Sequence, residues 1–154
     1  IKVQIANDNS EGQIVLSGKI EELDKLIIIL KEKSIKNIKL PVSAPFHCSL
    51  MSKATNIMSE ELNKLSFLQS ENKLISNVTA NEIRDTDELK DLLIKQIENR
   101  VRWRESVINM INNDVNHFIE IGPGKVLSGL VKRINREVKI STINNQGDIE
   151  SLEI

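Results

Sequence analysis

The first part of the chain alternates apolar and polar residues and then changes to a helical spacing. Strict alternation predicts a half-buried strand over residues 1–6, and a short apolar run predicts a second strand over 13–17, with a polar turn cluster between them. Apolar residues recur every three or four positions over 20–30, with glutamates in the first turn and lysines in the last, which is typical of an amphipathic helix. Alternation returns at 35–40 and predicts a third strand. Residues 1–41 are therefore expected to form a β-β-α-β unit, one element pair short of a ferredoxin-like module.

Two prolines mark the boundary to a second region. Pro41 and Pro45 restrict the residues before them to extended geometry, so this segment is expected to be a stiff connector without helix. Beyond it, helical and strand patterns alternate along residues 42–154, which is typical of an α/β layer with parallel strands. Helices are expected over 51–65, 85–97, 103–111 and 126–134, and strands over 74–78, 115–121 and 138–142.

Composition narrows the class of protein. With 154 residues, of which 40% are hydrophobic and 28% charged, the chain has the content of a globular protein rather than a disordered one. Its formal net charge of −1 lacks the basic excess of a nucleic-acid-binding or polybasic membrane-binding surface. No apolar run approaches the roughly 20 residues of a membrane span. A single cysteine excludes an internal disulfide and favours a reducing, cytoplasmic location.

His47 is the first candidate for acid–base chemistry. Histidine exchanges protons near neutral pH, and this one follows the proline-stiffened connector just before an expected helix. A stiff approach would fix the direction of the imidazole, as a general base requires; a helix-terminal histidine with a local hydrogen bond is the alternative. The adjacent Cys48 is expected to be buried and structural, because neighbours on a helix point in different directions and cannot form a nucleophile–base pair. His117, in an expected strand, is also expected to be structural.

A Gly-Pro-Gly turn is the second candidate site. Gly122 and Gly124 lie between an expected strand and an expected helix, where backbone N–H groups could hold a phosphate or a carboxylate. Their spacing is not that of a P-loop or a dinucleotide-binding loop, so a plain tight turn is an equal alternative. The acidic residues show no paired-carboxylate or metal-ligand pattern, which predicts no metal site. The sequence also contains no G-x-S-x-G nucleophile elbow.

Three segments, taken in order, resemble the C-terminal half of malonyl-CoA:acyl carrier protein transacylases. They are residues 6–18 (ANDNSEGQIVLSG), 40–51 (LPVSAPFHCSLM) and 120–130 (EIGPGKVLSGL). The shorter stretches NVTA and VRW also lie in the expected order, so the resemblance covers nearly the whole chain. It implies that residues 42–154 are the C-terminal part of an α/β-hydrolase-like acyltransferase core. It likewise implies that residues 1–41 belong to an incomplete ferredoxin-like (α+β) subdomain.

The resemblance assigns roles to individual residues. It implies that His47 is the catalytic histidine, which activates a serine to attack the malonyl thioester and later deprotonates the phosphopantetheine thiol of acyl carrier protein. The backbone carbonyl of Gln96 is expected to orient the imidazole, so that the Gln96 side chain would be replaceable. Asn7, Asn9 and Phe46 are expected to line the cleft, and the bulk of Phe46 would favour malonyl over methylmalonyl groups.

The same resemblance places several functional parts outside this sequence. The serine nucleophile, the arginine that pairs with the malonyl carboxylate and the oxyanion-hole residues belong to the N-terminal half of such enzymes. We therefore expect a fragment, starting without an initiating Met, that is inactive alone. Its expected partners are that N-terminal half, malonyl-CoA and acyl carrier protein, with no cofactor besides these substrates. The alternatives are a non-enzymatic remnant that binds carrier protein or CoA, and the acyltransferase domain of a polyketide synthase.

Overall fold

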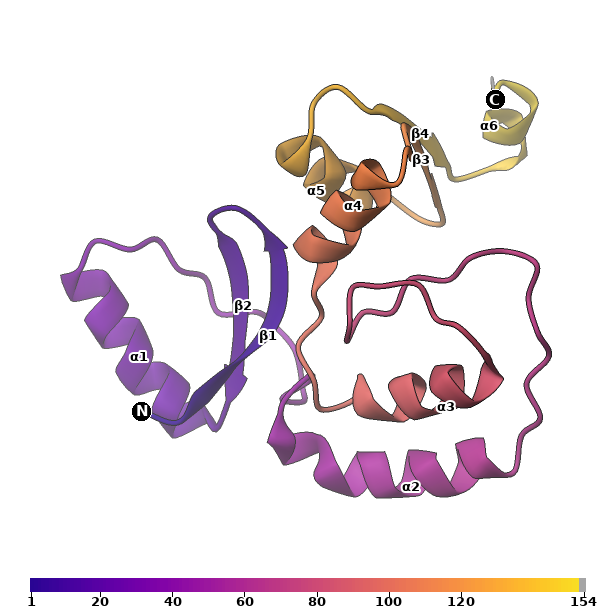
Figure 1. Cartoon of the computed structure of the whole chain (residues 1–154). Helices are drawn as coiled ribbons and strands as arrows, with labels where there is room; N and C mark the ends of the chain where they lie inside the picture. Colours follow the sequence, from indigo (N-terminus) through magenta and orange to yellow (C-terminus); the bar gives the residue numbers. More distant parts are fainter. Residues whose placement is uncertain (153–154) are drawn as a thin grey trace.

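The chain folds as a mixed α/β protein whose elements form three groups (Figure 1). The computed structural model describes residues 1–152, so the last two residues of the region expected over 42–154 lie outside it. A β-hairpin with one helix forms the first group, two helices that lie side by side form the second, and a parallel strand pair with its helices forms the third. Within residues 1–152 no helix has the length and apolar character needed to cross a membrane.

The first group is the hairpin of β1 (Val3–Ser10) and β2 (Gln13–Gly18), followed by α1 (Ile20–Glu32). The two strands are antiparallel, and Gly12 adopts a φ of 74° in the turn between them, a conformation that costs glycine little. Both predicted strands and the helix are confirmed. β1 is longer than predicted because its polar end still pairs with β2 through two irregularities of register, which are typical of β-bulges.

The prediction of a third strand over 35–40 is wrong. This segment has no regular structure, and Ile38 within it is 76% exposed. Alternation alone does not make a strand, because the backbone needs a neighbouring strand for its hydrogen bonds, and no strand of residues 1–152 pairs with this segment. The strand predicted over 74–78 is wrong for the same reason, since only an isolated bridge joins Ile75 to Glu82.

The second group contains α2 (Ser52–Asn63), which follows a short 3₁₀ turn, η1 (Ser49–Met51), and α3 (Thr86–Lys95). The predicted start of α3 is confirmed: Asp85 is the N-cap, and its Oδ1 accepts a hydrogen bond of 2.8 Å from the backbone N of Glu88.

The third group contains α4 (Trp103–Asn112), β3 (His117–Ile121), α5 (Val126–Ile134), β4 (Lys139–Ile143) and α6 (Gln146–Glu150). β3 and β4 are parallel, with α5 as the connection between them, so the prediction of parallel strands is confirmed for this pair. α6 was not predicted from the pattern. It begins at Asn145, whose side chain and that of Asp148 form a reciprocal capping box.

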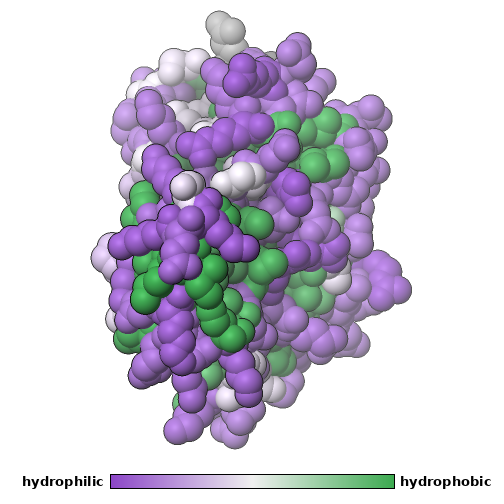
Figure 2. All heavy atoms as spheres, turned by 90° about the vertical axis from the view of Figure 1, so that its left-hand side faces the viewer, coloured by the Kyte–Doolittle hydropathy of each residue, from purple (hydrophilic) through white to green (hydrophobic). Residues whose placement is uncertain are grey.

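The buried apolar core is small and lies where the three groups meet. Its members are Ala6, Cys48, Ala80, Leu92, Val107, Leu130 and Val131. By contrast, α1 has no buried residue, and large apolar side chains of α1 and its neighbours, such as Ile20 and Ile28, are exposed. Figure 2 shows this side of the molecule, where apolar side chains gather between charged ones.

Candidate functional site around His47

The two residues that follow His47 in the chain are anchored to the β-hairpin. Cys48 is fully buried (0% exposed), and its Sγ lies 3.6 Å from Ser17 Oγ of β2. Ser49 donates two hydrogen bonds of 2.8 Å, from its backbone N and from Oγ, to Oε1 of Gln4 in β1. The prediction of a buried Cys48 is confirmed. The loop that carries His47 therefore has a fixed position on the hairpin.

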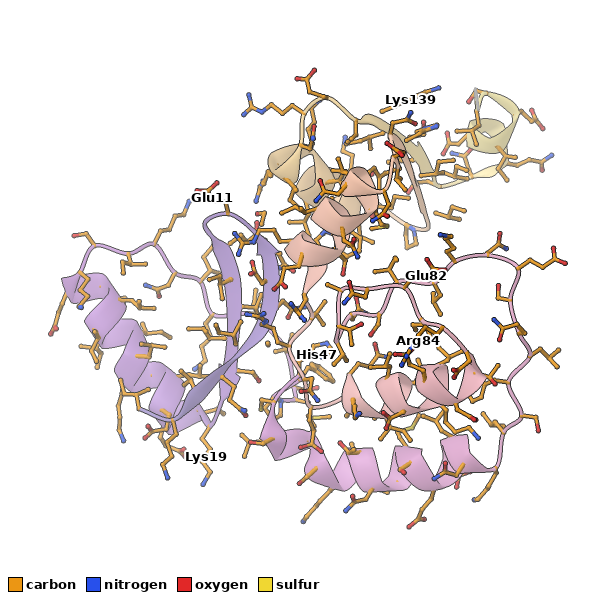
Figure 3. The ribbon with its side chains drawn as sticks, viewed as in Figure 1. Glu11, Lys19, His47, Glu82, Arg84 and Lys139 are labelled. Carbon is orange, nitrogen blue, oxygen red and sulfur yellow. The ribbon has the colours of Figure 1, made fainter. Side chains whose placement is uncertain are left out.

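His47 itself adopts an uncommon backbone conformation. Its φ of 57° lies in the left-handed region, which costs a non-glycine residue on the order of 1 kcal/mol and persists only where the surroundings enforce it. Figure 3 shows His47 where the hairpin, η1 and the end of α3 meet. The preceding segment contains no helix, as the two prolines predict.

The imidazole is oriented by a backbone carbonyl. His47 Nδ1 lies 2.8 Å from the carbonyl oxygen of Gln96. A carbonyl only accepts hydrogen bonds, so Nδ1 carries the hydrogen and the neutral ring keeps its lone pair on Nε2. No described side chain is hydrogen-bonded to Nε2, which leaves this atom available as a base. The structure thus brings together the two residues that the resemblance pairs, while the catalytic role of His47 stays a prediction.

Gln96 is held at the end of α3. It is the C-cap residue, and carbonyl groups in the last turn of a helix lack partners within the helix. Its backbone N donates to the carbonyl of Leu92 at 2.9 Å, and its side-chain Oε1 accepts a hydrogen bond of 3.3 Å from Asn77 Nδ2. The carbonyl that faces His47 is therefore attached to a residue fixed at two points.

Of the other residues expected to line the cleft, two lie on β1 and one is next to His47 in the chain. Asn7 and Asn9 are half-buried on β1, and Asn7 forms a parallel bridge with Val101, just before α4. Phe46, next to His47, has an exposed fraction of 49%. No hydrogen bond joins these three side chains to His47 within residues 1–152, so their cleft-lining role stays a prediction.

The hydrogen bonds of the Gly-Pro-Gly turn favour a tight turn over an anion site. Gly122 N donates to the carbonyl of Ile143 at 3.0 Å, and Gly124 N donates to Asn144 Oδ1 at 2.6 Å. Both glycines have positive φ values, 134° and 93°, which explains their presence in this turn. The two N–H groups that were candidates for an anion are thus occupied by protein acceptors.

The N-terminus of α5 also has an acceptor from the chain itself. Glu120 accepts hydrogen bonds from the backbone N of Leu127 at 3.0 Å and of Ser128 at 2.7 Å. Hydrogen bonds from Ser128 and from these backbone groups lower the pKa of the Glu120 carboxyl below its usual range. The carboxylate occupies the position that an external anion would take.

A polar network that the sequence analysis missed supports the site from α4. The Arg102 guanidinium forms an ion pair with Glu105 and donates to the carbonyl of Thr79 at 3.1 Å. The hydrogen bond from Arg102 lowers the pKa of the Glu105 carboxyl. A second ion pair joins α4 to β1, because Arg104 Nη2 lies 2.8 Å from Oδ2 of Asp8, which is only 5% exposed. No periodic pattern marks such pairs, and Asp8 lies in the segment that the sequence pattern predicts as a polar turn.

His117 occupies a separate environment. It is half-buried on β3, and its Nε2 lies 2.9 Å from Ser141 Oγ on the paired strand β4. This cross-strand contact agrees with the structural role expected for it. Within residues 1–152, no group of three or more His, Cys, Asp and Glu side chains is placed to hold a metal ion. The arrangement around His47 can orient a base, and the described residues add no nucleophile hydrogen-bonded to it.

Comparison with curated proteins gives consistent matches. Over 149 residues, or 96% of its length, the chain is 41% identical to malonyl CoA-acyl carrier protein transacylase of Bacillus subtilis and 38% identical to that of Staphylococcus aureus. The aligned part is 47% and 48% of these proteins, so the chain spans about half the length of the curated relatives it matches. No protein-family model matches the chain.

Solved structures give the same match in three dimensions. The structure of malonyl CoA-acyl carrier protein transacylase from Clostridium perfringens superimposes with a TM-score of 0.92 at 41% identity, over 97% of this chain and 48% of that chain. An acyl-carrier-protein-S-malonyltransferase from Bartonella henselae gives the same TM-score, identity and coverage. A third neighbour, at 30% identity and a TM-score of 0.92, is a malonyl-transacylase in complex with a type II polyketide synthase acyl-carrier protein.

Proposed function

We propose that this chain, a homologue of malonyl CoA-acyl carrier protein transacylases, is the C-terminal part of an enzyme that transfers malonyl groups from CoA to acyl carrier protein. The observation that carries the proposal is the 2.8 Å contact between His47 Nδ1 and the Gln96 carbonyl, which fixes the tautomer and direction that a general base needs. The homology over 96% of the chain supplies the reaction class. The mixed α/β fold agrees with it, while the hydrolase-like core and ferredoxin-like subdomain remain part of the proposal.

His47 acts as a base and then as an acid in each half of the reaction. In the first half, Nε2 takes the proton of a serine hydroxyl as the serine oxygen attacks the malonyl thioester. The CoA sulfur leaves and takes that proton from the imidazolium, which leaves a malonyl-serine ester. In the second half, Nε2 takes the proton of the phosphopantetheine thiol, whose sulfur attacks the ester. The serine oxygen leaves and recovers the proton.

The nucleophile belongs to the N-terminal half of the enzyme, which is the principal partner of this chain. The share of the relatives that the chain leaves uncovered, about half, provides room for it. The exposed apolar residues of the first group, among them Ile20 and Ile28, support an interface with further protein. The chain alone therefore lacks activity. Phe46 beside the base gives a preference for malonyl over methylmalonyl groups. The enzyme acts in the cytoplasm.

The experiment is complementation. The chain is combined with the N-terminal half of the Bacillus subtilis relative, and transfer of labelled malonyl from malonyl-CoA to phosphopantetheinylated carrier protein is measured. The combined halves transfer malonyl, and His47→Ala lowers the rate at least about 1,000-fold, as loss of the base does in triad enzymes. His117→Ala is the matched control and leaves the rate unchanged. Carrier proteins from fatty-acid and polyketide synthesis are both tested as acceptors.

Two results would contradict the proposal. Transfer by the isolated chain that His47→Ala abolishes would require a substitute nucleophile within these 154 residues. Transfer by the combined halves that survives His47→Ala would remove His47 from the mechanism. Binding of carrier protein or CoA without any transfer by the combined halves would instead support a non-enzymatic remnant.

A further inference from the structure

The loop of residues 76–81 is attached to α4 by its carbonyl groups. All four carbonyls from residue 77 to residue 80 accept hydrogen bonds from two side chains and one backbone group. The backbone N of Arg102 donates to the carbonyl of Asn77 at 2.9 Å. Its guanidinium donates to the carbonyls of Val78 and Thr79 at 3.5 and 3.1 Å. Asn109 Nδ2 donates to the carbonyl of Ala80 at 2.7 Å. The backbone of this loop is therefore fixed relative to α4 along its whole length.

The interior of the 76–81 loop is equally constrained. The buried Ser76 accepts hydrogen bonds at Oγ from the backbone N of Val78 and of Thr79, at 3.1 and 3.4 Å. Ala80 has a φ of 59°, a left-handed conformation that a residue with a Cβ adopts at a cost and keeps only when its surroundings enforce it. Backbone strain of this kind in a loop next to a site is typical of a positioning element.

One side chain of this loop points at the residue that orients the imidazole. Asn77 Nδ2 donates to Gln96 Oε1 at 3.3 Å, and the Gln96 carbonyl faces His47 Nδ1 at 2.8 Å. We infer that Asn77 is a positioning residue for His47: it holds the helix-terminal Gln96 so that its carbonyl stays aimed at Nδ1. The role of His47 as a base rests on the proposed function, whereas the coupling from Asn77 to the imidazole does not.

This inference changes the expectation for the Gln96 side chain. If only the backbone carbonyl mattered, any residue could replace Gln96. Through Oε1, however, the side chain connects the end of α3 to the fixed 76–81 loop. Without that connection the end of α3 would depend on the backbone hydrogen bonds of its last turn, such as the 3.3 Å bond from Ile97 N to the carbonyl of Ile94, and helix ends fray readily. The side chain then contributes to the direction of the carbonyl that it carries.

The test reads the tautomer of His47 directly by NMR of the chain labelled with ¹⁵N in histidine. The sequence has two histidines, so His117 serves as an internal reference. In the wild-type chain, neutral His47 is mainly the Nδ1–H form. Asn77→Leu, which is similar in size but forms no hydrogen bond, shifts the tautomer ratio about fivefold toward Nε2–H, the change expected for a hydrogen bond of about 1 kcal/mol. The signals of His117 do not move.

Companion variants separate positioning from general damage. Asn77→Asp restores the wild-type ratio, because the Gln96 amide can turn and donate to the carboxylate. Asn81→Ala is the matched control in the same loop: its side chain contacts Asn109 and the carbonyl of Thr79 rather than Gln96, and its loss leaves the ratio unchanged. Gln96→Ala keeps the backbone carbonyl and shifts the tautomer ratio as Asn77→Leu does. Adding Asn77→Leu to Gln96→Ala shifts the ratio no further.

An unchanged tautomer ratio in a folded Asn77→Leu chain overturns the inference. If Asn77→Leu does not fold, an unchanged ratio in Gln96→Ala overturns it in its place. The measurement needs no nucleophile and no substrate, so failure of the malonyl-transfer assay would not alter it. Conversely, transfer by the combined halves with no tautomer shift would leave the proposed function intact and remove Asn77 from it.

Discussion

Residues 1–42 and the surroundings of His47 differ in two properties: how much regular secondary structure they contain, and how many of their side chains are buried. The first region contains a hairpin and a helix of 13 residues, all with clear periodic patterns, yet α1 has no buried residue. The surroundings of His47 are mostly loops and helix ends with little periodicity. They nevertheless contain the fully buried Cys48, and the neighbouring α4 contains the fully buried Val107 and begins at the polar network around Arg102. Regular secondary structure therefore does not by itself bring burial: α1 has no buried residue, whereas α4 contains the fully buried Val107.

The difference shows what fixes a candidate site. Hydrophobic periodicity indicates where helices and strands form. It does not fix the position of such an element until another part of the protein packs against its apolar face. Around His47 the fixing groups are side-chain donors on backbone carbonyls, which define positions without needing a large core. The following variants test whether the stability of the chain is concentrated in this second region.

The largest difference is expected between two apolar residues. Val107 is fully buried in α4, while Ile28 in α1 is 58% exposed. Val107→Ala should lower the free energy of unfolding by about 2 kcal/mol, through lost burial and the cavity left behind. Ile28→Ala should change it by less than about 0.5 kcal/mol. Chemical denaturation of both variants measures this, and equal losses would show that α1 is as well packed as α4.

Two arginines provide a comparison of intermediate size. Arg102 donates to carbonyls of the 76–81 loop besides pairing with Glu105, whereas Arg84 pairs only with Glu88, four residues along the chain, and its side chain is 80% exposed. Arg102→Ala should cost about 1.5 kcal/mol, because it removes the guanidinium donor from the carbonyls of Val78 and Thr79 and the ion-pair partner of Glu105. Arg84→Ala should change the free energy of unfolding much less than Arg102→Ala, because an exposed ion pair contributes little. A loss for Arg84→Ala as large as that for Arg102→Ala would contradict the importance of this network.

The smallest effect is expected at the start of α5. Glu120→Gln should lower the free energy of unfolding by about 0.5 kcal/mol near neutral pH, because the charge at the helix N-terminus is lost. The pKa of Glu120 is lowered in the folded chain, so its carboxylate stabilises the fold above its usual pKa of 4.5, and this contribution is lost as the pH falls through the lowered value. The difference between variant and wild type should therefore shrink in acid. A difference independent of pH would show that the charge of Glu120 is unimportant.

Much of the secondary structure could be predicted from the sequence, and the exceptions have two causes. Helices α1, α4 and α5 follow from apolar residues repeated at helical spacing, and β3 and β4 from short apolar runs. The alternation over 35–40 predicted a strand that does not form, because a strand depends on a partner that local pattern cannot reveal. α6 was missed because its five residues are too few to show a period.

The candidate site was only partly predictable. His47 was noticeable because two prolines precede it, and Gln96 could be named only through the resemblance to transacylases. The hydrogen bonds from Arg102 to the 76–81 loop, and that from Asn77 to Gln96, join residues about 20 positions apart through specific polar atoms. Such contacts depend on the finished fold and leave no repeating signal in the sequence.

The burial of Cys48 has a consequence for motion at the site. Cys48 is fully buried, and the ring of the adjacent His47 is held by Gln96 on its other side. The imidazole should therefore share the small thermal amplitude of the core, although it lies in a loop between a connector and a 3₁₀ turn. In relaxation measurements its order should match that of Val107 rather than that of the exposed Phe46 beside it. A base with so little freedom would spend almost none of its time turned away from an incoming proton.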